Sequence, residues 1–192
     1  MKELLNKLNA CKDAREWAGD KSWQEIYNTC HRGDWLLWLF KRTNPDDLKL
    51  LTLAKGHCAN TVRHLMKDER SIKAVDAAIA FGEGKISRDE LDAAVAYADY
   101  AAYADAADYY AAFAASAAAY VDASAAASAA AAFAAADAAA AYAAYVTDAA
   151  YAAYDGAAYA YSAAAAAKKE NQQLTADICR KYLPIEVWNI TK

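Results

Sequence analysis

The first 92 residues alternate apolar and polar positions with the periodicity of short amphipathic helices. An apolar residue at every third or fourth position marks the buried face of such a helix. This spacing runs through Leu50, Leu53 or Ala54, His57 or Cys58, Thr61 or Val62, and Leu65, and continues through Ile72, Val75, Ala78, Ile79 and Phe81. The pattern therefore predicts a series of short helices that each bury one face.

Residues with special backbone preferences predict where these helices begin and end. Ser22 is suited to cap a helix over the residues that follow it, and the Gly33-Asp34 pair ends that helix and starts the next. Asn44-Pro45 is a typical helix start, because asparagine accepts hydrogen bonds from free N–H groups and proline fits the first turn. Gly82-Glu83-Gly84 predicts a stop. Ser87-Arg88-Asp89-Glu90 is a capping box that opens the next helix.

The composition changes abruptly near residue 93. Residues 93–167 include 45 alanines, 12 of the 14 tyrosines and 7 aspartates, but no lysine or arginine. Alanine has the highest helix propensity, so this segment is expected to be helical. Because one unbroken helix of this length would extend about 110 Å, we expect breaks. The candidate break points are Asp122-Ala123-Ser124, Thr147-Asp148 and Asp155-Gly156.

The C-terminal residues return to an ordinary composition after residue 168. Leu174, Ile178 and Cys179 predict a last short amphipathic helix that ends at Pro184. The apolar residues beyond the proline are expected to pack against the body of the protein; these are Ile185, Val187 and Trp188.

These elements together predict an all-α fold. Short amphipathic N-terminal helices would pack with two or three long antiparallel helices rich in alanine and tyrosine. Residues 1–92 would form the N-terminal helical region, and residues 93–192 the long-helix region with the C-terminal helix. At 192 residues in total, the two regions are expected to form one integrated domain.

The charge distribution limits the classes of partner. The net charge is −4, and the isoelectric point lies near 5.4. Residues 93–167 carry −7, and the remainder carries 21 − 18 = +3. We expect no nucleic-acid partner, since such a protein gathers basic residues on one face. We also expect no membrane span, because the longest stretches without aspartate, 123–136 and 109–121, have 14 and 13 residues against the roughly 20 that a span needs.

The N-terminus and the cysteines indicate the compartment. Charged residues interrupt the first 16 positions, so no apolar stretch resembles a secretory signal, and a cytoplasmic location is expected. The four cysteines form no CxxC pair and are expected to be reduced and buried; they are Cys11, Cys30, Cys58 and Cys179.

No motif in the sequence predicts an enzyme. Glycine-rich phosphate loops, HExxH and GxSxG are all missing from the sequence. Cys30, His31, His57, Cys58 and His64 could supply soft zinc ligands, but adjacent helical residues point about 100° apart, so burial of Cys58 is the better interpretation. We therefore expect a non-enzymatic protein with no metal and no cofactor.

Aromatic residues on helical faces are the best candidates for a binding surface. Trp35 and Trp38, three residues apart beside Asp34, either pack into the core or form a hot spot for a partner. Tyr97, Tyr100 and Tyr103 share a face in the same way. Arg42 and Arg63 are candidates to hold phosphate groups.

Several segments resemble a group of alanine-rich helical proteins of bacteria and their phages, some of which are described as immunity proteins. The similarity lies in GDWLLWL at 33–39, LAKGHCANTVRHL at 53–65, SIKAVDAAIAFGEGKISRDELDAAVAYA at 71–98 and QQLTADICRKYLPIEVW at 172–188, with the alanine tract between them. The resemblance implies a protein that neutralises a toxin or a host defence protein by binding it stoichiometrically. It supplies no functional residues.

Two other functions stay open at this point. Oligomeric helices could enclose a pocket in which tyrosines stack on a small nucleotide signal and arginines hold its phosphates, as in a sponge that sequesters the signal. Close packing of alanine helices also suits a homo-oligomer with a structural or assembly role.

Overall fold

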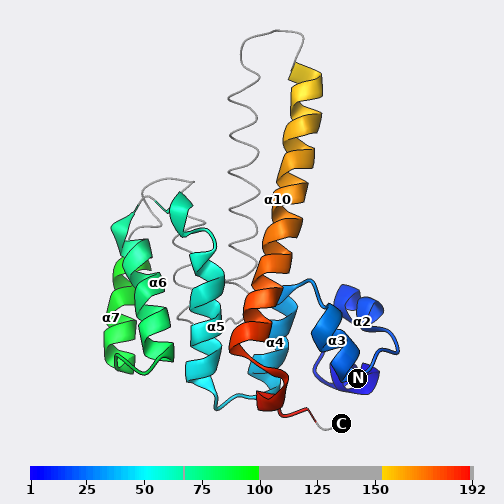
Figure 1. Cartoon of the computed structure of the whole chain (residues 1–192), viewed down its shortest axis with the longest axis horizontal. Coiled ribbons are helices and arrows are strands. Elements are labelled where there is room, and N and C mark those ends of the chain that lie inside the picture. The colour runs from blue at the N-terminus through cyan, green and yellow to red at the C-terminus, as the bar shows by residue number, and fades with distance from the viewer. Residues whose placement is uncertain (67, 100–152, 191–192) are drawn as a thin grey trace.

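The protein is all-α over the residues that the computed structural model describes, which are 1–66, 68–99 and 153–190 (Figure 1). Every regular element in these ranges is a helix, which confirms the predicted fold class. The predicted antiparallel packing of two or three long helices falls largely on residues 100–152, which lie outside these ranges.

Four short helices form the N-terminal part of the fold. They are α1 (Lys2–Lys7), α2 (Lys12–Ala18), α3 (Trp23–Thr29) and α4 (Gly33–Thr43). Helix α3 starts as predicted, because the Ser22 hydroxyl accepts a hydrogen bond from the Glu25 N–H at 3.3 Å and the Glu25 carboxylate accepts one from the Ser22 N–H at 2.8 Å. Helices of six or seven residues are unstable alone, so tertiary packing must hold them.

Helix α5 (Leu48–Asn60) begins three residues later than the sequence predicts. Asn44 is the C-cap of α4 and is buried, so it does not cap α5. Its side-chain amide donates to the Val187 carbonyl at 2.7 Å, and its side-chain oxygen accepts from the Asn189 N–H at 3.2 Å. Asn44 therefore fixes the C-terminal tail, and the predicted start at Asn44-Pro45 is wrong.

The 3₁₀ turn η1 (Arg63–Leu65) leads into α6 (Glu69–Gly82), which forms a hairpin with α7 (Arg88–Asp99). Helix α6 ends at Gly82 as predicted, and Gly84 takes the left-handed conformation with φ of 76°. The Ser87 and Glu90 capping box then opens α7, with hydrogen bonds of 2.8 and 3.3 Å between the two residues. Both boundaries confirm the sequence-based prediction.

Helix α10 (Ala153–Tyr182) is 30 residues long, and its first turns extend beyond the other described helices (Figure 1). The predicted break at Asp155-Gly156 is wrong, because that pair lies inside α10. One glycine costs only about 1 kcal/mol in a helix, and alanines surround it. The predicted C-terminal helix is the end of α10; it stops two residues before Pro184, and η3 (Ile185–Val187) follows. The other two break points lie outside the described residues.

The helices enclose two clusters of buried residues. One cluster contains residues of the five helices α1, α2, α3, α4 and α5, of α10 and of the C-terminal tail. The other contains residues of α5, α6 and α7. Helix α5 contributes to both, with Leu51 and Cys58 in the first cluster and Ala59 in the second. In Figure 1, α6 and α7 stand on one side of α5, and α10, α4 and the first three helices stand on the other.

Small residues let the helices approach closely. A Cβ on Gly33 would lie 2.6 Å from the backbone carbon of Thr175 in α10, and one on Gly82 would lie 2.7 Å from the Cα of Leu53 in α5. Ala54 and Ala176 are fully buried. The helix backbones thus approach closely between α4 and α10 at Gly33 and between α5 and α6 at Gly82.

None of the helices in the described ranges combines the length and the apolar character that a membrane span requires.

Candidate functional site

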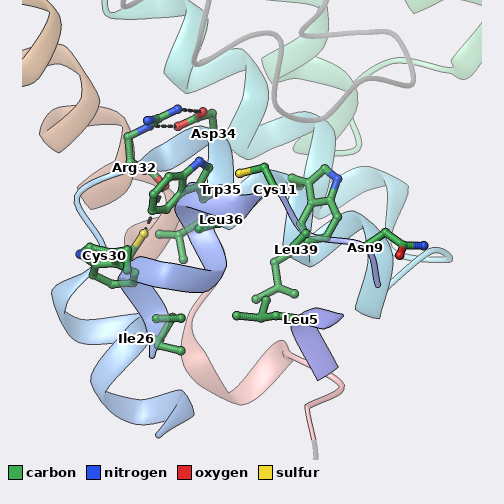
Figure 2. A pocket seen from close by; sticks show the side chains of 15 residues that line it. Leu5, Asn9, Cys11, Ile26, Cys30, Arg32, Asp34, Trp35, Leu36 and Leu39 are labelled. Atoms are coloured by element: carbon green, nitrogen blue, oxygen red, sulfur yellow. Dashed lines mark hydrogen bonds and ion pairs between the residues drawn. The ribbon is translucent and has the colours of Figure 1, made fainter. Parts of the chain in front are cut away.

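A pocket of about 400 Å³ lies between the first three helices and α4 (Figure 2). Leu5 of α1 and Ile26 of α3 contribute apolar walls, and α4 contributes Trp35 and Trp38. In Figure 2, Leu5 and Ile26 lie below the centre of the view, and Arg32 and Asp34 lie above it. The volume is within the range of pockets that hold small ligands or a buried side chain of a partner.

The helical period of α4 explains how this wall forms. Leu37 and Phe40 are fully buried in the first core cluster, and they anchor one side of the helix. Trp35 and Trp38 are three residues apart and border the pocket, and Arg42 follows four residues later on the same stripe of the helix, outside the residues that line the pocket. Both tryptophans are half-buried, packed against the core on one side and open on the other. They are therefore both core residues and pocket walls.

Three tryptophans border the pocket, and each has a cation over its ring. Trp17 of α2 lies 5.9 Å from Trp35, measured between ring centroids. The distances from cation to ring are 4.7 Å for Lys21 over Trp17, 4.6 Å for Arg32 over Trp35 and 5.6 Å for Arg42 over Trp38. These are within the range of cation–π attraction, which fixes both partners. Trp17, Trp35 and Trp38 thus give the pocket aromatic walls, and a cation contacts each of the three rings.

An ion pair closes one edge of the pocket. The Arg32 Nε donates to Asp34 Oδ1 at 2.8 Å, and its Nη2 donates to Asp34 Oδ2 at 2.5 Å. Hydrogen bonding to Asp34 holds the pKa of Arg32 above its ordinary value, although partial burial acts in the opposite direction. Asp34 lies in the first turn of α4, where the helix dipole favours a negative charge. The geometry of Arg32 over Trp35 is therefore fixed before any ligand binds.

The cysteines differ in accessibility. All four are free thiols, and Cys30, Cys58 and Cys179 are buried as predicted. Burial raises the pKa of Cys30 to about 11, and its thiol donates to the Arg32 carbonyl at 3.5 Å. Cys11 is exposed and borders the pocket, so the prediction of burial is wrong for this residue. It lies at the N-terminus of the short helix α2, where little of the fold covers it.

The structure brings together only some of the predicted binding residues. Asp34, Trp35 and Trp38 border the same pocket, and Arg42 lies over Trp38. Arg63 is elsewhere, in η1, where it forms a two-pronged ion pair with Asp76 of α6.

The predicted tyrosine face cannot be placed at the pocket. Tyr97 lies in α7, but its side chain is not among those described, and Tyr100 and Tyr103 lie outside the described residues. The candidate site therefore consists of the tryptophan pocket and the cations beside it.

Sequence reasoning missed Trp17, Arg32 and Cys11. Trp17 is one aromatic residue in a two-turn helix without a clear amphipathic pattern, and its contact with Trp35 joins two separate elements. Arg32 directly precedes α4, so its ring contact depends on how the chain enters that helix. The only available signal was the presence of three tryptophans in the first 40 residues besides Trp23.

The polar groups around the pocket indicate what it can bind. Arg32 and Asp34 bond to each other, and the other polar groups among the lining residues are the Asn9 amide, the Cys11 and Cys30 thiols and the indole N–H groups. Within the described ranges, no three His, Cys, Asp or Glu side chains converge in the way that a metal site needs. Because tryptophan, leucine, isoleucine and alanine make up most of the lining, the pocket suits an apolar or aromatic group.

Comparison of the chain with models of protein families, with curated proteins and with solved structures finds no match in any of the three.

Proposed function

We propose that the protein is a non-enzymatic binding protein that captures a partner protein stoichiometrically, with an apolar side chain of the partner inserted between Trp17, Trp35 and Trp38. The observation that carries this proposal is the pocket itself, in which three tryptophans are held in place and half-exposed. Tryptophan is among the residues that contribute most energy to protein interfaces, especially in a concave and dry centre.

The rigidity of the pocket supports a binding role. The Arg32–Asp34 pair, the ring contacts and the packing against the core fix the tryptophans in the free protein. A preorganised pocket loses little side-chain entropy when it is filled, so more of the contact energy appears as affinity. This is the behaviour that a stoichiometric inhibitor requires.

The pocket favours a side chain over a small nucleotide. A nucleotide would need arginines to hold its phosphates and free polar groups to read its base. Arg32 is paired with Asp34, and Arg63 is paired with Asp76 of α6, so Arg42 over Trp38 is the one predicted phosphate-binding arginine beside a pocket tryptophan. The resemblance to immunity proteins adds that the partner is a toxin or a host defence protein.

Substitution of Trp38 tests the proposal. The tagged protein is purified gently from its host, and native mass spectrometry identifies the molecules that it retains. We expect one protein at fixed stoichiometry, with its affinity weakened at least about 30-fold by Trp38→Ala, since a hot spot contributes 2 kcal/mol or more.

Leu174→Ala is the matched control, because Leu174 is an apolar residue of α10 that is 46% exposed and lies outside the tryptophan pocket. It should leave the partner's affinity unchanged. If the folded Trp38→Ala protein retained the partner as well as the folded wild type does, the proposal would be refuted. Retention of a nucleotide in place of a protein would favour the sponge.

A further inference from the structure

The lining of the tryptophan pocket carries no uncompensated charge. Among the described residues that form it, Arg32 and Asp34 alone are charged, and they are joined by hydrogen bonds of 2.8 and 2.5 Å. The chain around the end of α2, beside the pocket, carries charges of both signs, on the exposed acids Glu16 and Asp20 and on Lys21. A charge that leaves water without meeting an opposite charge costs free energy. The pocket is therefore complementary to a neutral side chain.

The rings of Trp17, Trp35 and Trp38 border this neutral space. The planes of Trp17 and Trp35 are inclined by 56°, and the His31 ring meets Trp17 edge-on, with centroids 5.9 Å apart in both pairs. An aromatic ring is negative on its faces and positive along its edge, so inclined pairs of rings attract each other. An aromatic occupant can continue this arrangement with its face or its edge, whereas an aliphatic side chain offers no such charge distribution.

Small side chains form much of the rest of the lining. Ala14 and Ala18 lie one helical turn apart on α2, and Ala10 and Cys11 precede that helix. The space that they leave is part of the volume of about 400 Å³. A gap beside a side chain forfeits the contacts that another atom would make there. A wide, flat side chain therefore gains more contacts in this pocket than a narrow aliphatic one.

We propose that the side chain with which the partner fills this pocket is aromatic. This inference rests on the proposed function and names the chemistry of the anchoring residue. The ring of a phenylalanine, tyrosine or tryptophan packs between the pocket tryptophans and the small residues of α2, and no charge accompanies it into the pocket. Contacts between rings strengthen binding about three- to tenfold beyond the effect of the apolar area that they bury. An aromatic anchor is therefore favoured over an aliphatic side chain of the same shape.

Peptides that differ in one side chain test this preference. Four capped pentapeptides have glycine and serine flanks, and their central residue is phenylalanine, cyclohexylalanine, leucine or lysine. Cyclohexylalanine has nearly the shape of phenylalanine and is more apolar, but it has no aromatic ring. The readout is the rate at which iodoacetamide alkylates Cys11 of the full-length protein, since Cys11 is exposed and borders the pocket. This rate also reports weak binding, because the peptides can be added at millimolar concentration.

We expect the phenylalanine peptide to halve the alkylation rate of Cys11 at a concentration about three- to tenfold lower than the cyclohexylalanine peptide needs. The leucine peptide should protect less, and the lysine peptide should not protect. A second thiol introduced by Leu174→Cys is the internal control, because Leu174 is exposed on α10 and lies outside the pocket. Its alkylation rate should stay unchanged. A cyclohexylalanine peptide that protects as well as the phenylalanine peptide, or better, would contradict the inference.

Matched substitutions locate the preference in the tryptophan rings. The double variant Trp17→Phe, Trp38→Phe keeps two rings, and the double variant Trp17→Leu, Trp38→Leu removes them with a comparable loss of volume. Circular dichroism shows whether both proteins are folded. The preference for phenylalanine over cyclohexylalanine should persist in the first variant and shrink towards equal affinity in the second. The same preference in both folded variants would overturn the role of these rings. The comparison of peptides on the wild type decides the question if the leucine variant does not fold.

The outcomes separate this inference from the proposed function. Equal protection of Cys11 by the phenylalanine and cyclohexylalanine peptides would overturn the aromatic preference and leave the apolar anchor intact. Strong protection by the lysine peptide would overturn the neutral character of the occupant. No protection by any peptide would also overturn the inference, and a partner unaffected by Trp38→Ala would overturn the proposed function as well. Protection by adenosine monophosphate at a lower concentration than by the phenylalanine peptide would favour a nucleotide in place of an aromatic side chain.

Discussion

Helices α4 and α10 approach each other closely at Gly33. A Cβ here would lie 2.6 Å from both the backbone carbon and the side-chain oxygen of Thr175. The Gly33 carbonyl also accepts a hydrogen bond from the buried Cys179 thiol at 3.6 Å. The end of a flexible side chain can move aside to relieve a close contact, but the backbone of a helix cannot. A larger residue at position 33 must therefore move the two helices apart.

Gly33→Ala is therefore expected to destabilise the protein by about 1 to 3 kcal/mol, the usual cost of overpacking. Urea unfolding followed by circular dichroism measures the change. Helix propensity alone would predict the opposite sign, because alanine favours a helix over glycine by about 1 kcal/mol. A stabilised Gly33→Ala protein would show that the close approach is not required.

His57 makes stability depend on pH. Its ring stacks on Tyr182 with centroids 4.0 Å apart and an interplanar angle of 6°. Burial, followed by the nearby Lys181, lowers the pKa of His57 below its ordinary value of 6.5, although Glu83 acts in the opposite direction. The unfolded chain therefore binds the proton more readily than the folded protein does, and stability falls as pH decreases below 6.5.

His57→Phe keeps an aromatic ring beside Tyr182 but removes the titration. Between about pH 7.5 and about pH 5, the wild type should lose more stability than this variant, because only the wild type takes up a proton here on unfolding. The measurement is the free energy of unfolding of both proteins across this pH range. Identical pH profiles would rule out His57 as the source.

Arg180 joins two elements, α10 and the C-terminal end of α3. Its Nε donates to the Tyr27 carbonyl at 2.8 Å, and its Nη2 donates to the Cys30 carbonyl. In return, the Tyr27 hydroxyl lies 3.2 Å from the Leu183 carbonyl beyond α10. Ile26 and Cys30, on the same segment, form part of the pocket wall. The position of that wall thus depends on a cation from the other end of the chain.

Arg180→Ala should cost about 2 kcal/mol of stability, since hydrogen bonds from a charged group contribute roughly 1.5 to 3 kcal/mol. Thermal unfolding measures this loss. Asp177→Asn is the matched control: it weakens the 2.6 Å contact of Arg180 with an exposed carboxylate and leaves the bonds to α3 intact. An exposed ion pair contributes less than about 1 kcal/mol, so equal losses in the two variants would contradict the role assigned to Arg180.

Helix boundaries were predictable from the sequence where the hydrogen bonds that set them join residues close together in the chain. Ser22 with Glu25 and Ser87 with Glu90 form their capping bonds within three residues. Asn44 looked like a similar cap, but its amide binds Val187, which is 143 positions away. No pattern in the residues around Asn44 could reveal that bond.

Within the candidate site, too, the residues that are close together in sequence were predictable, and those brought together by packing were not. Asp34, Trp35 and Trp38 were predictable because they are close in sequence on one helix, where the spacing shows which residues share a face. Trp17 and Cys11 were not, because their place beside α4 depends on how two short helices pack. The sequence therefore predicted one wall of the pocket and not the opposite one.

On the scale of the whole molecule, the pocket lies at the end of the fold formed by α1 to α4. Helices α6 and α7 form a separate buried cluster on the far side of α5 (Figure 1). A partner anchored at the pocket would therefore contact the short N-terminal helices and leave that hairpin uncovered. These short helices depend on packing for their stability, so occupation of the pocket should also stabilise them.

The rate of Cys11 alkylation in the complex tests the central claim most directly, because this thiol borders the pocket and the other three cysteines are buried. Mass spectrometry follows the modification of the free protein and of its complex with the retained partner. If a partner side chain fills the pocket, alkylation of Cys11 should slow at least about tenfold in the complex, and a cysteine introduced by Leu174→Cys should react at an unchanged rate. Alkylation of Cys11 at the same rate in both states would show that the partner binds elsewhere.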